Sequence, residues 1–591
     1  MQASKSISRS LTNLWEHISP RRKRQFFLLT VLIVAASLTE IISIGAVLPF
    51  LATLTEPDRI FALPVAQPLI QAMNLTQSNQ LLLPLTIAFG FAAVLAGVMR
   101  LLLLWTSTRL SFATGADLSY DIYQRTLHQD YEVHIARNSS IIIDGILNKP
   151  SIVIYEIVMP ILNFISSLIM LVVILIGLVL VDPATAAISF SGFGFIYIVV
   201  VMISRNRLQI NSESIAREST SVIKSLQEGL GGIRDVLLDG SQNTYLNSFK
   251  GSDSQLRKAQ GDNAFITAGP RFAIEALGML LIAILAYYLN QQVNGFSKAI
   301  PILGAFALGA QRLFPNLQQV YASWAKIKGG QASLQDALHL LNQPMPKHLD
   351  EIAKPMAFTE MIELKNLSFR YHADAPWVLR HLNLHITKGS RIGFIGSTGC
   401  GKSTLIDIVM GLLKPTDGCL EVDHHRIDAA NRRSWQANIA HVPQTIFLAD
   451  STIAENIAFG IPKHLINMER VKEAAAQAQV AQIIENWPDQ YNSFVGERGV
   501  RLSGGQRQRI GIARALYKKA DVIIFDEATS ALDNETEESV MQAIENLHHD
   551  ITILMIAHRL TTLRNCTQII ELGNQNILRT LTYDQLNSEP K

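Results

Sequence analysis

The chain has 591 residues, of which 48% are apolar and only 17% are charged, and its formal net charge is +2. This length is too great for one hydrophobic core, and the apolar composition indicates membrane segments, so at least two domains are expected. The small net charge gives no indication of nucleic-acid binding. The cysteines Cys400, Cys419 and Cys566 form no C-x-x-C pair, which argues against a disulfide framework or a zinc site.

Residues 1–25 are predicted to form a cytoplasmic segment that lies at a membrane surface. Leu11, Trp15 and Ile18 share one helix face among polar residues, a pattern typical of interfacial helices. The basic run 21–24 then precedes the apolar run 26–54. That run is too long for a signal peptide and is interpreted as a first membrane helix with its basic end in the cytoplasm.

Residues 26–341 are predicted to form an all-α transmembrane domain of six spans, since about twenty apolar residues cross a bilayer as a helix. The outer segments would hold only Arg59 and Lys298 as cations, whereas the inner segments hold many. The positive-inside rule therefore places the N-terminus in the cytoplasm. The predicted spans are 26–54, 81–106, 152–181, 185–204, 265–289 and 299–324.

The inner segments 107–151 and 205–264 keep helical periodicity with charged faces and few helix breakers. We interpret them as membrane helices that continue into the cytoplasm; the alternative, an unstructured loop of this length, is uncommon. Polar interruptions near 130–140 and 238–245 would be docking points for a cytoplasmic domain. The outer segment 55–80 carries an apolar face, either for the outer membrane interface or for plain packing.

Several ionisable residues lie within or at the edges of the apolar runs, where a charge facing lipid costs several kcal/mol. Glu275 lies one turn after Arg271, so internal pairing and a role in a cavity are both open. Arg100 and Arg312 have no acidic residue nearby in sequence, which favours a basic cavity for an anionic head group. The candidate cavity residues are Arg100, Arg271, Glu275 and Arg312, and Glu40 belongs to the same intramembrane group.

Residues 342–357 contain three prolines and are predicted to be a linker, whereas 358–591 alternate strands with helices like an α/β nucleotide-binding domain. Residues 396–404 fit the G-x-x-x-x-G-K-[ST] phosphate-loop pattern between an apolar strand and a helix. Their backbone N–H groups would cradle a polyphosphate at a helix N-terminus. The predicted loop residues are Gly396, Ser397, Thr398, Gly399, Cys400, Gly401, Lys402, Ser403 and Thr404.

The phosphate loop and a second apolar strand together predict an ATP-hydrolysing site. Lys402 would reach the β- and γ-phosphates, and Ser403 would hold Mg²⁺. Cys400 lies inside the loop, so a thiol-alkylating reagent should inhibit the site and ATP should protect it. Asp526 and Glu527 end the second strand, where ligands bind in parallel sheets. Asp526 would hold Mg²⁺, and Glu527 would polarise the attacking water.

Between these two elements, the stretch Leu502-Ser-Gly-Gly-Gln506 begins a helical run and offers a second anion site. Two such sites on one chain suggest that two copies meet around each nucleotide. The stretch, extended to Ile510, resembles the signature of ATP-binding-cassette (ABC) transporters, and the remaining cassette motifs follow in order across 358–580. The residues of the second anion site are Ser503, Gly504, Gly505 and Gln506.

The resemblance implies roles for residues that mean little by themselves. Tyr371 would stack on adenine, Gln444 would link Mg²⁺ and the attacking water to the membrane domain, and His558 would contact the γ-phosphate. Glu497 matches the segment that precedes the signature in exporters, and Asp533 matches the D-loop that crosses the dimer interface. The catalytic positions of the family are all present, so the resemblance implies ATP hydrolysis with Mg²⁺ as cofactor.

Six spans followed by one cassette resemble an exporter half-transporter. This implies a homodimer, or a heterodimer with a related chain, in the inner (plasma) membrane, with the N-terminus and the cassette in the cytoplasm. Residues 38–51, 269–275 and 312–315 resemble bacterial lipid-linked oligosaccharide flippases. That resemblance implies an amphipathic, anionic lipid-linked substrate that moves from the cytoplasmic to the outer side of the bilayer.

A peptide or secondary-metabolite exporter is the main alternative, although no peptidase domain precedes the first span, which disfavours export coupled to leader cleavage. An ATP-gated membrane scaffold or channel is the alternative from another class, and the intact catalytic residues disfavour it. Six spans exclude a soluble cassette ATPase that acts on nucleic acid. The fusion of spans and cassette disfavours a binding-protein-dependent importer.

Overall fold

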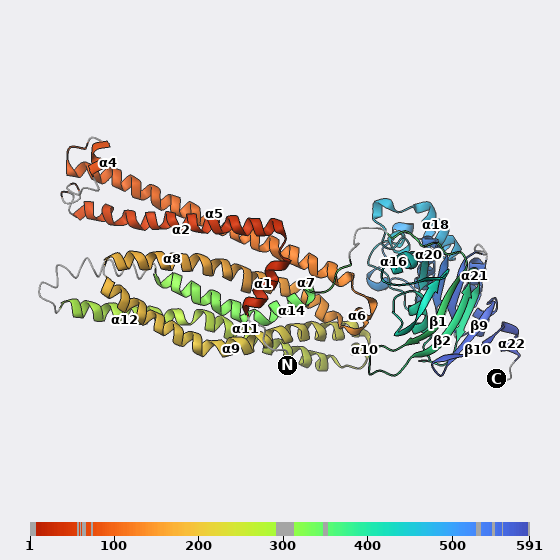
Figure 1. Cartoon of the computed structure of the whole chain (residues 1–591). Helices are drawn as coiled ribbons and strands as arrows, with labels where there is room; N and C mark the ends of the chain where they lie inside the picture. Colours follow the sequence, from red (N-terminus) through yellow and green to blue (C-terminus); the bar gives the residue numbers. More distant parts are fainter. Residues whose placement is uncertain are drawn as a thin grey trace. The chain divides into compact units, whose positions relative to one another are not determined.

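The computed structural model describes the chain except for residues 1–6, 56–57, 59–60, 62–66, 73–74, 182, 291–312, 347–352, 528–533, 546–549, 558 and 589–591. The chain divides into two compact units. The helical unit comprises Met1–Gln129 and Ala136–Pro346, and the cassette unit comprises Asp130–Ile135 and Lys347–Lys591. The first unit is built of helices, and the second combines sheets with helices (Figure 1).

The helical unit consists of long helices that pack side by side (Figure 1). Many of their apolar side chains face outward: Phe27, Phe91 and Leu101 are about two-thirds exposed or more, which suits contact with lipid. The helices of this unit are α1 (Ile7–His17), α2 (Pro20–Thr55), α4 (Gln67–Ala72), η1 (Ser78–Leu81), α5 (Leu82–Leu127), α7 (Ser139–Ile152), η2 (Val153–Val158), α8 (Met159–Val181), α9 (Pro183–Gly231), α10 (Ile233–Leu238), α11 (Gln242–Ala268), α12 (Pro270–Asn290), a helix over 313–329, and α14 (Gln331–Leu341).

Three helical stretches of the described residues are long and apolar enough to cross a membrane: Pro20–Ser43, Ser78–Leu127 and Ser139–Ile176. They overlap the predicted spans that begin at residues 26, 81 and 152. The remaining predicted spans begin at residues 185, 265 and 299 and include positions outside the described residues or side chains. The total of six spans therefore stays a prediction. The interfacial role of 55–80 also stays a prediction, because part of this segment lies outside the described residues.

The predicted helical extensions are confirmed, and the long-loop alternative is wrong. Helix α5 continues to Leu127, and α7 starts at Ser139 after a short helix. Helix α9 continues to Gly231, and after α10 the chain turns and re-enters helix at Gln242. The breaks therefore fall close to the polar interruptions expected near 130–140 and 238–245.

A buried charged network joins three helices of this unit. The Lys149 ammonium on α7, 2% exposed, lies 3.0 Å from the carboxylates of Asp144 and Asp336. Asp144 is fully buried and accepts a hydrogen bond from Ser219 on α9 at 2.8 Å. Because Asp336 lies on α14, the network ties α7, α9 and α14 together. Buried charges are stable only with such partners.

The cassette unit contains an antiparallel sheet with strand order β2-β1-β4-β5 and a larger sheet with order β10-β9-β3-β8-β7-β6. In the larger sheet β6, β7, β8, β3 and β9 run parallel, and β7 and β8 are buried at nearly every position, as expected for central strands. The strands are β1 (Met361–Phe369), β2 (Leu379–Thr387), β3 (Arg391–Ile395), β4 (Asp417–Val422), β5 (His425–Arg426), β6 (Ile439–Val442), β7 (Val522–Asp526), β8 (Thr552–Ile556), β9 (Gln568–Gly573) and β10 (Asn576–Leu581).

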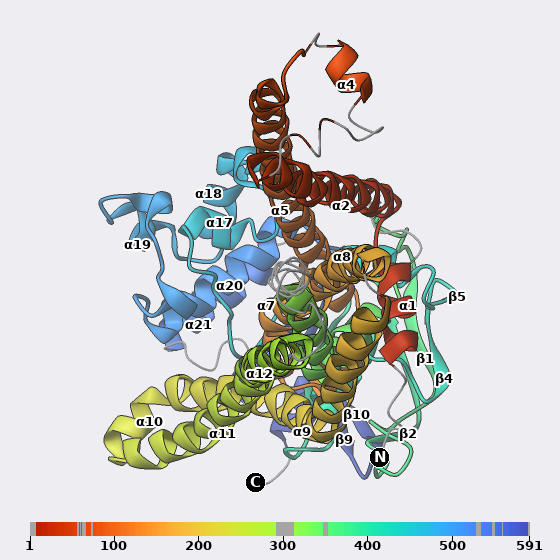
Figure 2. The same cartoon turned by 90° about the vertical axis from the view of Figure 1, so that its left-hand side faces the viewer.

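Two hydrophobic cores support the cassette, one around β1–β3 and α15 and one around β6, β7, α18 and α20. Helices α17 to α21 gather on the side away from β1, β2, β4 and β5 (Figure 2). The helices are α6 (Tyr131–Ala136), α15 (Lys402–Val409), α16 (Arg432–Ala437), α17 (Ile453–Ile457), η3 (Lys463–Leu465), α18 (Met468–Gln477), α19 (Ala481–Glu485), η4 (Gln490–Asn492), η5 (Glu497–Gly499), α20 (Gly504–Lys518), α21 (Asn534–Glu545), η6 (Leu560–Leu563) and α22 (Tyr583–Asn587). The predicted class, an all-α helical domain followed by an α/β cassette, is confirmed.

Candidate functional site

The phosphate loop leaves β3 at Ile395 and enters α15 at Lys402. Gly396, Gly399 and Gly401 have φ angles of 144°, 82° and 101°, which favour glycine. A Cβ on Gly396 would lie 2.3 Å from the carbonyl oxygen of Leu572, so this position accepts no side chain. The loop is thus shaped as a bare backbone cradle that ends at a helix N-terminus, a geometry that fits a polyphosphate.

The Lys402 side chain lies across this cradle. Its ammonium donates hydrogen bonds to the carbonyls of Gly396 at 2.8 Å and Ser397 at 3.0 Å, and lies 3.9 Å from the Cys400 sulfur. The residue is only 8% exposed. Neutral carbonyls orient the ammonium without cancelling its charge, so a full positive charge is available to phosphate oxygens.

Tyr371 lies beside the same loop, two residues after the end of β1. Its hydroxyl is 3.1 Å from the hydroxyl of Thr404, and its ring packs edge-on against Phe369 with 5.0 Å between centroids. About half of the Tyr371 side chain is exposed. In the first turn of α15, Ser403 is also exposed, so its hydroxyl is accessible. An exposed ring fixed next to the phosphate cradle suits the predicted stacking on a base.

Gln444 and Glu527 meet at the carboxyl ends of the neighbouring parallel strands β6 and β7. The Gln444 amide donates a hydrogen bond of 2.6 Å to the Glu527 carboxylate, across 83 positions of sequence. Glu527 has a φ of 50°, and its N–H donates to the carbonyl of Ile556 at 3.0 Å. This hydrogen bond at the end of β8 holds Glu527 in a backbone conformation that is uncommon for a residue with a side chain.

Negative charge accumulates next to Lys402. Burial raises the pKa of Asp526, the adjacent Glu527 raises it further, and Lys402 lowers it. Burial, with a contribution from Asp526, raises the pKa of Asp407 on α15 to about 6. Because carboxylates this close disfavour one another's ionisation, a divalent cation would relieve the repulsion.

This donor set fits Mg²⁺. Asp526, Ser403 and Gln444 are the residues that would hold the ion. In the part of the chain that the structure describes, no group of three His, Cys, Asp or Glu side chains forms a metal site by itself. Such a set suits an ion that usually completes its shell with phosphate oxygens and water.

The signature turn forms a capping box at the start of α20. The Ser503 N–H donates to the Gln506 side-chain oxygen at 2.9 Å, and the Gln506 N–H donates to the Ser503 hydroxyl at 3.2 Å. Gly504 and Gly505 occupy the first turn, without side chains that would cover the helix end. The turn is therefore ordered as a helix N-terminus, and its role as a second anion site stays a prediction.

Three predicted site residues, Arg312, Asp533 and His558, lie outside the described residues. The segment that follows His558 is anchored by Glu537 on α21. This carboxylate is 6% exposed, lies 2.8 Å from Arg559 and accepts a hydrogen bond of 2.8 Å from the Thr562 hydroxyl. Glu537 belongs to no motif and was missed in the sequence, because only the fold brings it to the segment around residue 559.

The short helix α6 belongs to the cassette unit, since Asp130–Ile135 group with it. The Asp130 carboxylate lies 2.5 Å from the Arg432 guanidinium, and the Lys414 N–H donates to the Glu132 carboxylate at 3.2 Å. This confirms that the first predicted interruption of the inner helices is a docking point.

Tyr131 on α6 is affected electrostatically by two residues of the cassette. Burial raises the pKa of its phenol, and so do the nearby Asp407 and Tyr371. Asp407 is the same carboxylate that lies beside Asp526. Nothing in the sequence linked Tyr131 with Asp407, because they lie far apart in the chain.

The candidate cavity residues that the structure describes, Arg100, Arg271 and Glu275, are held in charge pairs. A cavity of about 320 Å³ is lined by Glu40 and Arg100 together with small polar side chains. Arg100 donates to Glu40 at 2.9 Å, and Arg271 pairs with Glu275 at 2.7 Å one turn away. Arg100 thus has an acidic partner, although none lies nearby in sequence, and its role in a cavity for an anionic head group stays a prediction. Its partner lies 60 positions away on α2, where sequence proximity cannot reveal it. The further lining residues with polar side chains are Ser37, Ser166 and Asn316.

Comparison with protein-family models matches residues 379–530 to the family described as ABC transporter. The ATP-dependent lipid A-core flippase of Cupriavidus metallidurans is 30% identical over 385 residues, which cover 65% of this chain and 64% of that protein. The corresponding flippase of Ralstonia nicotianae is 31% identical, with 63% of each chain covered. Mouse ATP-binding cassette sub-family B member 5 is 37% identical over 48% of this chain and 23% of its own length.

The chain thus matches slightly less than two thirds of the length of the curated flippases to which it is similar. Among solved structures, a bacterial Atm1-family ABC exporter with ATP bound has a TM-score of 0.73 at 23% identity, with 92% of this chain and 95% of that chain covered. At this identity the likeness describes the fold, which extends over both units.

Proposed function

We propose that this chain, which carries an ABC transporter domain on the fold of an ABC exporter, is one half of a homodimeric ATP-driven exporter or flippase. ATP would bind between the phosphate loop of one copy and the signature turn of the other. Hydrolysis would move an amphipathic, anionic lipid-linked substrate from the cytoplasmic to the outer side. The N-terminus and cassette would lie in the cytoplasm, with the spans in the plasma (inner) membrane.

The hydrogen bond between Gln444 and Glu527 is the observation that carries the ATPase part of this proposal. It fixes the Glu527 carboxylate, which would orient the attacking water, next to Asp526, while Lys402 supplies positive charge from the adjacent cradle. Phosphoryl transfer needs chiefly such positioning and charge stabilisation. Mg²⁺, when bound, would neutralise charge on the phosphate oxygens.

Helix α6 supports coupling of the cassette to the membrane helices. In sequence it lies between α5, which ends at Leu127, and α7, which begins at Ser139. Arg432 pairs with Asp130, just before the helix, and the Lys414 N–H donates to Glu132 within it. A cassette that moves on ATP binding would therefore pull on the ends of both helices.

Exposed apolar side chains support the second copy. Leu237 and Leu238, at the second predicted docking point, are 61% and 75% exposed. In the cassette unit Phe447 and Phe494 are more than half exposed. A dimer in which one copy's α10 meets the other copy's cassette would bury both sets of apolar side chains.

The similarity to lipid A-core flippases supports the substrate class. Inside the 320 Å³ cavity, an anionic head group would replace Glu40 as the partner of Arg100. Within a membrane domain, breaking an ion pair costs little free energy when a group of the same charge takes the place of the lost partner. Arg271 and Arg312 are proposed as further contacts of the same head group.

The test is ATPase activity of the purified chain in lipid vesicles, with lipid-linked diphosphate sugars, plain phospholipids and peptides added in turn. We expect stimulation by the lipid-linked sugars, and loss of that stimulation but not of basal activity in Arg100→Gln. Vesicles that contain the Glu527→Gln variant give the background rate of ATP hydrolysis. Stimulation by peptides alone would overturn the substrate class, and no ATPase activity in any vesicle would overturn the whole proposal.

A further inference from the structure

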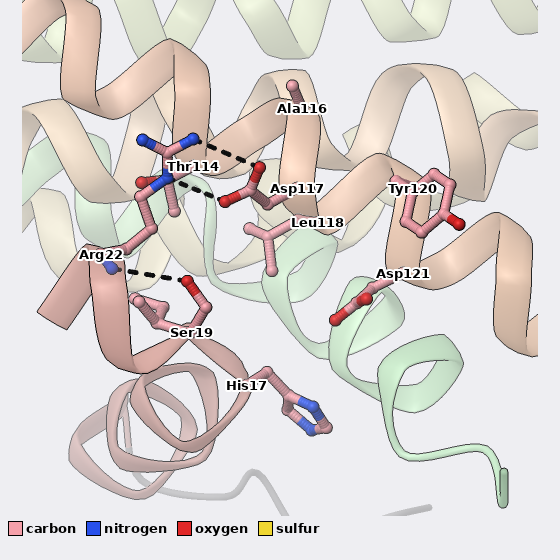
Figure 3. Close-up of a pocket in the computed structure, with 10 residues that line it drawn as sticks. His17, Ser19, Arg22, Thr114, Ala116, Asp117, Leu118, Tyr120 and Asp121 are labelled. Atoms are coloured by element: carbon pink, nitrogen blue, oxygen red, sulfur yellow. Dashed lines mark hydrogen bonds and ion pairs between the residues drawn. The ribbon is translucent and has the colours of Figure 1, made fainter.

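A second cavity of the helical unit, about 310 Å³ in volume, lies where α1 meets α2 and faces α5 (Figure 3). Its ionisable lining comes from three elements: His17 at the end of α1, Arg22 at the start of α2, and Asp117 and Asp121 on α5. None of these residues belongs to the nucleotide site or to the cavity around Arg100.

The charges in this cavity are unequally balanced. The Arg22 guanidinium donates to the Asp117 carboxylate at 2.8 and 3.4 Å, which neutralises that acid. The His17 ring nitrogen Nε2 lies 3.0 Å from the Asn342 side-chain oxygen. Within the described residues, neither a hydrogen bond nor an ion pair reaches the Asp121 carboxylate, which points into the space beside His17 (Figure 3). Arg125 on the same helix acts on Asp121 through its charge without a direct contact, so the oxygens of the Asp121 carboxylate can still accept hydrogen bonds.

The cavity lies where apolar surface gives way to charge. Arg22 precedes the exposed Phe27 by five residues, roughly 7.5 Å along a helix. The head-group layer of a bilayer is roughly 5–8 Å deep on each side. Trp15 on α1 packs on Phe26 with 5.9 Å between rings, and the Lys23 ammonium lies 5.8 Å from the Trp15 ring, contacts typical of helices at the bilayer surface.

We propose that this cavity binds the head group of a phospholipid that carries a primary ammonium. The ammonium would donate its hydrogen bonds to Asp121, and the phosphate would lie against the basic run 21–24 at the opening. A trimethylammonium head group has no N–H to donate, and an anionic head group without an amine meets repulsion from Asp121. The site is separate from the transported substrate and does not depend on its identity.

Native mass spectrometry of the full chain tests this proposal. The detergent-purified protein is mixed with equal amounts of phosphatidylethanolamine, phosphatidylcholine and phosphatidylglycerol of identical acyl chains. We expect the wild type to retain phosphatidylethanolamine several-fold over the other two, and Asp121→Asn, a change of equal shape, to lose that preference. Asp121→Glu should keep it, because the carboxylate remains.

The matched control is Glu16→Gln, which removes an exposed carboxylate of α1 that does not line the cavity; its lipid preference should equal that of the wild type. Equal retention of the three lipids by the wild type would overturn the proposal. An unchanged preference in Asp121→Asn would do the same. Displacement of the bound lipid by an equal concentration of free ethanolamine would overturn the assignment to a lipid.

Discussion

Lys402 in the cassette unit and Arg100 in the helical unit are both cations beside a candidate binding space, but they are held in different ways. Lys402 is oriented by neutral carbonyls of its own loop, so its charge stays available for phosphate. Arg100 is held by the Glu40 carboxylate of another helix, so an anionic ligand must replace that partner. One site is ready for its ligand as folded, whereas the other must exchange a charge pair first.

The largest effect is expected in the cassette. Glu527→Gln keeps the hydrogen bond with Gln444 possible but removes the charge that orients water, so ATP turnover should fall by about 10²- to 10⁴-fold while ATP still binds. ATP should then hold two copies together, measured by size-exclusion chromatography with light scattering. The control Glu538→Gln, exposed on α21, should turn over ATP normally. Normal turnover in Glu527→Gln would refute the assignment of the base.

The helical unit should respond most to its buried network. Lys149→Met leaves Asp144 buried without its cation and should lower the free energy of unfolding by about 3–5 kcal/mol. Asp144→Asn in the same chain should restore part of this loss. The exposed pair of Lys224 and Glu228 is the control, and Glu228→Gln should cost less than about 1 kcal/mol. Equal shifts in denaturant melts of Lys149→Met and Glu228→Gln would contradict the network.

The reactivity of cysteine thiols should differ between the phosphate loop, which holds Cys400, and the buried core, which holds Cys566. A maleimide should inactivate the ATPase through Cys400, which lies beside Lys402 in the phosphate loop, and ATP should slow the reaction. Burial raises the pKa of Cys566 to about 12, which keeps it as an unreactive thiol. Burial and the hydrogen bond to Glu421 also raise the pKa of the half-buried Cys419, which lowers its thiolate fraction. Cys400→Ala should be resistant. Full ATPase activity after stoichiometric alkylation of Cys400 would contradict this prediction.

The smallest effect is a pH-dependent gain in stability. Because the folded pKa of Asp407 is raised to about 6, its protonated form favours folding at low pH, and that contribution is lost as the pH rises through 6. At pH 7.5 Asp407→Asn should therefore melt higher, by about 2–4 °C for about 1 kcal/mol after allowance for the exposed part of the carboxylate. The gain should shrink as the pH falls toward 4. Asp374→Asn, exposed in the same unit, is the control, and a pH-independent gain in Asp407→Asn would count against the shift.

The parts of the molecule that were predictable from sequence are those in which residues close together in the chain determine the local structure. The phosphate loop between β3 and α15 and the capping box of Ser503 and Gln506 each span fewer than ten positions, so their residue pattern determines their shape. The meeting of Gln444 and Glu527 was accessible only through resemblance to a family, because two separate strands bring them together.

The remaining contacts depend on how helices pack, and no local pattern encodes them. Glu40 reaches Arg100 across 60 positions, and Lys149 reaches Asp336 from another helix. Glu537 and Tyr131 are likewise ordinary residues in sequence that acquire a role from their neighbours in the fold. This is why the shape of the phosphate loop was predictable from sequence, whereas the partner of Arg100 was not.

The central claim is that two copies of the chain build each ATP site. Copies with Lys402→Met and copies with Ser503→Arg, each inactive by itself, can be co-expressed with different tags and purified through both tags, so that every dimer is mixed. A shared site predicts that ATPase activity returns in these mixed dimers, since one phosphate loop and one signature turn remain intact and face each other. Mixed dimers as inactive as either parent would contradict the account.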